Sequence, residues 1–280
     1  MRDGVHVSTR GGYREAARRA DAHGCKAYQF FPKNPRSLSV KSIDESDARR
    51  CAAFCEERGI VSIAHSPYPT NVASEEIEQR ARTVESLLND LAIAEACGAL
   101  GVVVHFGVYK GTDPLEGYRN AVLTLSTVTS QWQGRAKLLI ENQAGDGSFM
   151  GTTMEELAQI RSLCIDPHKI GFCLDTCHLF ASGVWDGAPD AAWMDKAIEL
   201  GVIQHAAAIH LNDSVYPSGE RRDRHARIGE GHIGERGLTW LLRHPLLKDV
   251  PFILETPSDA DGTHRGQLEL IRKLGGESRA

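Results

Sequence analysis

The sequence predicts an α/β protein built as one closed (β/α)8 barrel, a TIM barrel, over residues 1–280. Eight short apolar runs alternate along the chain with longer segments of helical periodicity, the pattern of repeated strand–helix units. The length of 280 residues suits a barrel, which needs roughly 250. Polar side chains also follow the later strands where each strand ends, and a barrel gathers its strand ends at one face.

The strands are apolar and rich in β-branched residues, as parallel strands buried on both faces usually are. The run from Ile170 to Asp175 is the clearest example, because it stays apolar until it ends in a carboxylate. No linker or low-complexity segment interrupts the series. The eight predicted strands are 5–7, 27–31, 60–64, 101–104, 137–140, 170–175, 206–209 and 251–254.

Helical segments separate the strands, and glycines mark several of their ends. Gly24, Gly59 and Gly98 each follow such a segment, where a glycine takes the left-handed conformation that terminates a helix. The predicted helices are 13–22, 44–58, 75–97, 114–131, 154–163, 191–200, 238–242 and 267–273.

A doubly wound open sheet is the competing architecture for alternating strands and helices. Such a sheet normally binds a nucleotide through a glycine-rich first turn. The first turn here reads Ser8-Thr9-Arg10-Gly11-Gly12, which is not G-x-G-x-x-G. The closed barrel is therefore the predicted fold.

The composition is that of a globular protein, with 41% hydrophobic and 25% charged residues and a net charge of −5. This charge gives no general attraction to nucleic acid, so DNA contacts must come from local basic loops. No apolar run approaches the ~20 residues that span a bilayer, and the N-terminus lacks a signal-peptide core. Seven cysteines, an odd number, indicate reduced thiols in a cytoplasmic protein. The pairs Cys51/Cys55 and Cys173/Cys177 are poorly spaced for half a zinc site.

Six successive strands end in a titratable side chain. A single histidine in such a place is usually structural. Six around one barrel mouth would repel or desolvate one another unless cations held them, so the series indicates metal ions. The six side chains are those of His65, His105, Glu141, Asp175, His210 and Glu255.

Three further donors follow the sixth and seventh strands. His178 lies three residues after Asp175, a spacing that fits a metal site or, equally, a surface aspartate that caps the next helix. Asp223 and His225 stand in a polar loop after the seventh strand and are a weak signal alone. Together with the strand ends they make five imidazoles and four carboxylates, enough for two or three ions. Mixed N/O ligation favours zinc, with manganese or iron as alternatives, and such clusters suit phosphodiester hydrolysis.

These residues stand in motifs that resemble endonuclease IV, the family of deoxyribonucleases that incise DNA at apurinic/apyrimidinic sites. The resemblance covers essentially the whole chain, with several motifs in the same order. The most specific are Cys173-Leu174-Asp175-Thr176-Cys177-His178, His210-Leu211-Asn212-Asp213-Ser214 and 223–231, supported by Glu141-Asn142-Gln143-Ala144-Gly145 and His65-Ser66-Pro67-Tyr68.

The resemblance implies one metal-dependent endonuclease domain, a (β/α)8 barrel over residues 1–280, with a trinuclear zinc cluster. Manganese can occupy one or more of the zinc positions. The implied ligands are His65, His105 and the bridging Glu141 for one ion; Glu141, Asp175, His210 and Glu255 for the second; and His178, Asp223 and His225 for the third.

The implied reaction is hydrolysis of the phosphodiester 5′ to an abasic site, leaving a 3′-hydroxyl, with Glu141 as the catalytic residue beside the attacking hydroxide. A repair diesterase activity on blocked 3′ ends is implied as well. The partner is then double-stranded DNA, the family indicates a monomer, and no membrane is involved. Arg36 and Tyr68 correspond to DNA-binding residues that enter the minor groove. The basic cluster Arg221, Arg222, Arg224 and Arg227 suits phosphate contacts.

The sequence departs from the family pattern near the DNA-binding loops. Phe106-Gly107-Val108-Tyr109 replaces the usual Pro-Gly-Ser-His, Pro69 follows Tyr68, and Ser37 follows Arg36. All nine ligand positions are intact, so these departures concern how DNA is held.

Two other functions compete with the nuclease. A sugar isomerase or epimerase with a related barrel would use ligands like those of the second ion around one or two metals, without His178, Asp223 and His225. A zinc-dependent DNA-binding protein would hold the ions and cut nothing. Metal stoichiometry separates the first competitor, and loss of cutting on substitution of Glu141 separates the second.

Overall fold

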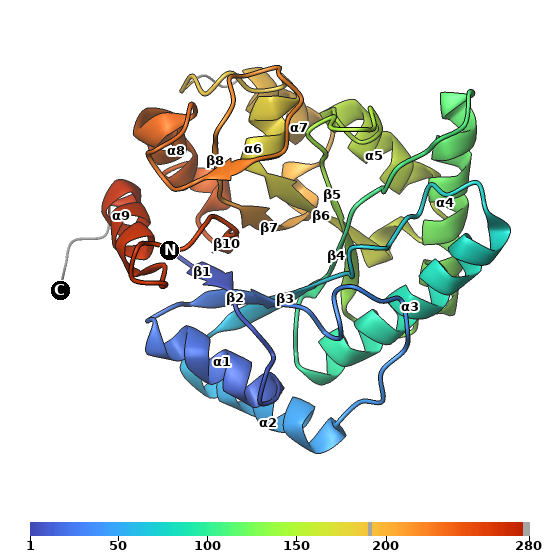
Figure 1. Ribbon diagram of the computed structural model, residues 1–280, viewed down its shortest axis with the longest axis horizontal. Coiled ribbons are helices and arrows are strands. Elements are labelled where there is room, and N and C mark those ends of the chain that lie inside the picture. The colour runs from blue at the N-terminus through green and yellow to red at the C-terminus, as the bar shows by residue number, and fades with distance from the viewer. Residues whose placement is uncertain (190–191, 277–280) are drawn as a thin grey trace.

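Eight parallel strands close into a barrel in the computed structural model, which describes residues 1–189 and 192–276 (Figure 1). Each strand pairs with the next along the chain, and the last pairs with the first. The predicted (β/α)8 fold is therefore confirmed. The barrel strands are β1 (Asp3–His6), β2 (Ala27–Phe30), β3 (Val61–His65), β4 (Gly101–Val104), β5 (Lys137–Glu141), β6 (Ile170–Asp175), β7 (Ala206–His210) and β10 (Phe252–Leu254).

Helices surround the barrel (Figure 1). The predicted bounds of α1, α4 and α5 match the structure, and the predicted start of α7 at residue 191 lies outside the described residues. The main helices are α1 (Tyr13–Ala22), α2 (Glu45–Arg58), α3 (Ile77–Ala96), α4 (Pro114–Gln131), α5 (Met154–Leu163), α6 (Thr176–Ala181), α7 (Ala192–Glu199), α8 (Gly234–Leu242) and α9 (Arg265–Gly275). Short 3-10 turns are η1 (Pro167–Lys169), η2 (Ile203–His205) and η3 (Pro245–Leu247).

The predicted elements differ from the structure in three places after β6. The short helix α6 directly after β6 was foreseen only in the alternative in which Asp175 caps the next helix, with no range given, and α8 begins at Gly234 rather than at residue 238. Its first turn contains two glycines, which weaken the helical signal in the sequence. The segment after β7 also contains an unpredicted antiparallel hairpin, β8 (Asp213–Ser214) with β9 (His225–Ala226).

Side chains alternate along each strand between the barrel interior and the helical layer. The outward residues, such as Tyr28, Val102 and Phe172, join the large core beneath the helices. The inward residues form a separate small cluster: Ala27, Ile63, Val103, Leu139, Cys173, Ala208 and Ile253.

The predicted strand-terminal donors all lie two residues beyond a member of this interior cluster, as His65 does beyond Ile63 and Glu141 beyond Leu139. The alternation therefore turns them inward at the carboxyl ends of the strands. This is the face where barrels of this kind build their sites. No helix among the described residues has both the length and the apolarity needed to cross a membrane.

Candidate metal centre

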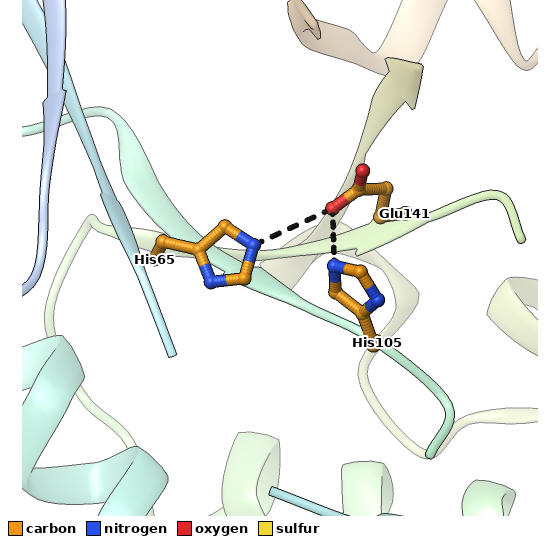
Figure 2. A group of neighbouring side chains, drawn as sticks. All are labelled: His65, His105 and Glu141. Carbon is orange, nitrogen blue, oxygen red and sulfur yellow. Dashed lines mark ion pairs between the residues drawn. The ribbon is translucent and has the colours of Figure 1, made fainter. Parts of the chain in front are cut away.

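Glu141 lies at the centre of the mouth and is completely buried. Its Oε2 atom is 2.8 Å from His105 Nε2 and 3.6 Å from His65 Nε2 (Figure 2). These three side chains come from the ends of β5, β4 and β3 and can offer one atom each to the same ion. We call His65, His105 and Glu141 the first donor group.

The other oxygen of Glu141 faces a second set of donors. Its Oε1 atom is 3.0 Å from His210 Nδ1, which is also 3.1 Å from Glu255 Oε2 and 3.9 Å from Asp175 Oδ2. One atom from each side chain can reach the same ion. Glu141, Asp175, His210 and Glu255 form the second donor group, so Glu141 belongs to two groups at once.

The third donor group is His178, Asp223 and His225. His178 Nε2 is 3.2 Å from Asp223 Oδ2, and His225 Nε2 is 3.2 Å from Asp223 Oδ1. The hairpin brings His225 to the mouth, since β9 pairs with β8 immediately after the end of β7. Asp223 is the most exposed donor of this group, with 42% of its side chain accessible.

The predicted alternatives for Asp175 and His178 are both partly right. Asp175 does cap α6, because its Oδ1 accepts a hydrogen bond from the backbone N–H of His178 at 2.8 Å. Both side chains are buried rather than on the surface, and each belongs to a donor group. The cap and the candidate metal site therefore use the same carboxylate.

Cys177 also lies within reach of Asp175 and His225. Burial raises the pKa of its thiol far above the usual range, so the sulfur keeps its proton. The thiol donates to the backbone oxygen of Arg224 at 3.7 Å. In the metal-free protein Cys177 is thus a hydrogen-bond donor, unlike the thiolate ligands of zinc centres.

The hydrogen bonds of the histidine rings test whether these residues fit a metal. In three of them Nδ1 faces a backbone oxygen, which can only accept, so Nδ1 carries the proton. The lone pair of Nε2 is then directed at a carboxylate, and Glu141 Oε2, His178 Nε2 and His225 Nε2 are buried without a hydrogen-bond partner. Two opposed acceptors need a proton or a metal ion between them, so the residues fit a metal. The three contacts are His65 to Ser66 O (2.8 Å), His178 to Asn142 O (2.8 Å) and His225 to Glu255 O (3.3 Å).

The carboxylates and imidazoles also shift one another's pKa values. Burial favours a higher pKa for Glu141, but the positive charge of His105 and its neighbours outweighs burial and holds the pKa well below the usual range. Burial favours lower pKa values for His178 and His225, but the carboxylates of Asp175 and Asp223 together outweigh it. The pKa of His178 lies well above its usual range and that of His225 is raised to about 9. Protons therefore compete with metal ions for these nitrogens.

Two buried asparagines hold Asp175 in place, one through its carboxylate and one through its backbone. Asn212 Nδ2 donates to Asp175 Oδ2 at 2.6 Å, and Asn212 Oδ1 accepts the backbone N–H of Glu255 at 2.9 Å. Asn142 Oδ1 accepts the backbone N–H of Asp175 at 2.8 Å, while its Nδ2 donates to the backbone oxygen of Asp175 at 3.1 Å. Both asparagines stand in motifs of the sequence analysis, where no role was assigned to them.

Asp213 explains why the motif after β9 is rich in glycine. This buried carboxylate accepts hydrogen bonds from five backbone N–H groups at 2.8–3.3 Å, and so holds the chain around the hairpin. At Gly231 an added Cβ would lie 2.4 Å from Ser214 O and 2.5 Å from Asp213 Oδ1, so only glycine fits. The donors are the N–H groups of Ser214, Gly229, Gly231, Ile233 and Gly234.

A cavity of about 560 Å³ opens above the donors, and one of the residues that line it is Tyr68, which is 70% exposed. Phe31 supports the ring of Tyr68, with the two ring centres 5.3 Å apart. Arg36 is exposed on the adjacent loop and does not line the cavity, but the loops are joined because Tyr68 N–H donates to Pro35 O at 2.8 Å. The structure therefore brings the two predicted DNA-binding residues to one side of the mouth.

The other predicted rim features are partly engaged in local contacts. Arg221 stacks on Phe149 at 4.7 Å, and Arg222 stacks on Tyr216 at 3.7 Å. Arg227 donates to the backbone oxygen of Ser258 at 2.9 Å. Among the departures from the family pattern, Phe106 is buried, while Gly107 and Val108 line the cavity.

Comparison with known proteins identifies the family of this chain. The family model described as "Xylose isomerase-like TIM barrel" matches residues 17–274. A protein named "Probable endonuclease 4" from Symbiobacterium thermophilum is 39% identical over 98% of this chain and 99% of its own length. The solved structure of endonuclease IV from Thermus thermophilus has a TM-score of 0.86 and 34% identity, and the match covers 99% of this chain and 100% of that one.

A D-tagatose 3-epimerase-like protein shares the fold, with a TM-score of 0.70, but only 21% of the sequence, over 96% of this chain and 98% of that one. That likeness concerns the barrel alone. The full-length matches at higher identity carry the assignment. This chain belongs to the endonuclease IV family of xylose isomerase-like TIM barrels.

Proposed function

We propose that residues 1–280 form one metal-dependent endodeoxyribonuclease domain that hydrolyses the phosphodiester 5′ to an abasic site in double-stranded DNA and leaves a 3′-hydroxyl. The observation that carries the proposal is the set of three donor groups at one mouth, linked by the buried carboxylate of Glu141. Family membership gives the class of enzyme, a hydrolase that cuts DNA. Blocked 3′ ends are a second substrate of the same site, and the enzyme acts as a monomer.

The three donor groups would hold three zinc ions, and manganese can replace zinc at one or more positions. Imidazole nitrogens and carboxylate oxygens together are the donor set that zinc accepts, whereas magnesium and calcium prefer oxygen alone. Bound ions supply a strong nucleophile at neutral pH, a clamp for the phosphate and charge for the leaving oxygen.

The protein's own residues supply position and shielding. Glu141 is the proposed catalytic residue, because its two oxygens face two different donor groups and fix their separation. The asparagines that hold Asp175 keep the second donor group rigid. Tyr68 and Arg36 would bind DNA, and the exposed aromatic ring of Tyr68 can stack against bases beside the abasic gap.

A sugar isomerase or epimerase is the alternative that shares the barrel. Such an enzyme works with one or two ions and has no use for the third donor group. Here the hairpin of β8 and β9 brings His225 within 3.2 Å of Asp223, in contact with His178, and Tyr68 projects from the rim. These features favour the nuclease.

The test measures the metal content of the purified protein and the nicking of a duplex that carries one abasic site. The wild-type protein should hold three ions per chain and cut once, 5′ to the site. Glu141→Gln should abolish cutting while the protein still binds the duplex. Glu220→Gln is the control, because Glu220 is an exposed carboxylate on the rim loop that carries Asp223 and belongs to none of the donor groups. A protein loaded with three ions that leaves the duplex intact would refute the proposal, and one ion per chain would favour the isomerase.

A further inference from the structure

The first two strands also contribute a polar side chain each to the barrel mouth. Gln29 follows the interior residue Ala27 by two positions on β2 and is 0% exposed. His6 at the end of β1 is paired in register with Gln29. Neither residue was predicted as part of the site. A polar side chain within an apolar strand was the only signal for Gln29 in the sequence.

Gln29 contacts two members of the second donor group at the same time. Its Oε1 atom is 2.7 Å from His210 Nε2, and its Nε2 atom donates to Glu255 Oε1 at 2.5 Å. The same Nε2 atom is 3.2 Å from Nδ1 of His6. Both polar atoms of the amide are therefore hydrogen-bonded inside the mouth, and its partners His6 and Glu255 line the cavity.

Only one orientation of the amide satisfies these contacts. The carboxylate of Glu255 can only accept, so the NH2 group of Gln29 must face it. The amide oxygen then faces His210 Nε2, which must carry a proton. The lone pair of His210 Nδ1 is left for the interior of the site, where it lies 3.0 Å from Glu141 Oε1 and 3.1 Å from Glu255 Oε2.

We propose that Gln29 is a positioning residue for the metal ion of the second donor group. It selects the ring nitrogen that His210 presents and holds the carboxylate of Glu255 in place. His6 supports the same orientation of the amide from the other side. The inference rests on the proposed function, since it concerns one of the three ions proposed there.

A purely structural role is the alternative, in which Gln29 only fills space between β1 and β3. Gln29→Leu separates the two roles, because leucine has nearly the same size and removes all three hydrogen bonds. Gln29→Glu keeps the acceptor for His210 and loses the donors to Glu255 and His6. Ile63→Val is the control, since Ile63 is paired with Gln29 on β3 and contributes no polar contact.

The measurements are zinc content and zinc affinity in competition with a chelator, together with the ¹⁵N-imidazole spectrum of His210. In Gln29→Leu we expect one ion to bind about 10- to 100-fold more weakly, the usual effect of removing such a hydrogen bond, while the other two stay unchanged. The Nε2–H resonance of His210 should lose its hydrogen-bonded shift in Gln29→Leu and keep it in Gln29→Glu. Ile63→Val should change neither readout.

Equal zinc affinity in Gln29→Leu and the wild type, at three ions per chain, would overturn the inference. A His210 resonance that does not respond to Gln29→Leu would overturn it as well. If the wild-type protein held no zinc, the proposed function would fail instead. The His210 resonance alone would then test the role of Gln29, because this spectrum reports the hydrogen bond between Gln29 and His210 even when no metal is bound.

Discussion

Asp213→Asn should disable the third donor group while the barrel stays folded. Asp213 has no predicted ligand role, but its carboxylate collects five backbone N–H groups around the hairpin of β8 and β9. That hairpin presents His225 to the mouth, and Asp223 lies just before it. Replacing this carboxylate by an amide should therefore first release Asp223 and His225, two donors of the third group.

The expected loss of stability follows from how the five hydrogen bonds divide between the two carboxylate oxygens of Asp213. Oδ1 accepts three of the N–H groups and Oδ2 accepts two, those of Gly229 and Gly231. An asparagine would place its NH2 at the Oδ2 position, because this orientation sacrifices fewer bonds. Two donors then lose their acceptor, at about 1–3 kcal/mol each, which gives roughly 2–6 kcal/mol. This approaches the whole stability of many domains, about 5–15 kcal/mol, so local opening of the hairpin is expected before global unfolding.

Urea unfolding, zinc content and nicking should be measured together on Asp213→Asn. We expect reduced stability, loss of the third ion with retention of the other two, and a large loss of cutting. Asp261→Asn is the control, since Asp261 accepts bonds from Thr263 in an exposed loop and its substitution should change stability by less than about 0.5 kcal/mol. Three tightly bound ions and unchanged unfolding in Asp213→Asn would refute this account of the hairpin.

Three other predictions follow from buried and exposed groups. In protein kept metal-free with a chelator, burial lowers the pKa of His225, but Asp175 and Asp223 together raise it to about 9, from 6.5 in the unfolded chain. The stabilisation of the folded state by protonated His225 is therefore complete below pH 6.5 and is lost as the pH rises through 9. The Tm of the metal-free protein should fall between these pH values. A flat or rising Tm would contradict this prediction. Lys33→Met should lower the free energy of unfolding in urea by about 3–5 kcal/mol, because the buried carboxylate of Asp90, now 3.0 Å from the lysine nitrogen, would lose its partner. Adding Asp90→Leu should recover most of this loss. A double variant as unstable as Lys33→Met would contradict this explanation. Tyr68→Ala should leave the zinc content and the stability unchanged, since Tyr68 is 70% exposed. It should weaken binding to an abasic duplex by roughly 1–3 kcal/mol, measured by titration. Binding equal to that of the wild type would exclude the ring from the DNA interface.

Much of the fold could be predicted from local patterns. The bounds of α1, α4 and α5 follow from helical periodicity between glycine or proline signals, and β6 from its unbroken apolar run. The extent of the short helix α6 and the hairpin of β8 and β9 were not predicted. Each has too few residues for a periodic pattern to emerge, and the hairpin is held mainly by Asp213 rather than by its own strands.

The sequence alone determined that a barrel would form and that six donors would meet at its mouth. The physical reason is that parallel strands in a barrel point their carboxyl ends to the same face, so a polar residue at each strand end is sufficient to predict the meeting. Glu141, at the end of β5, is the clearest case.

Only the tertiary structure decided how these donors divide into groups and what holds them. Glu141 serves two donor groups because His105 and His210, far apart in the sequence, face its two oxygens. Gln29 reaches His210 and Glu255 across 181 and 226 positions of sequence. Contacts over such separations leave no local pattern, since they depend on where barrel closure places each strand, and that is why the supporting residues were found in the structure.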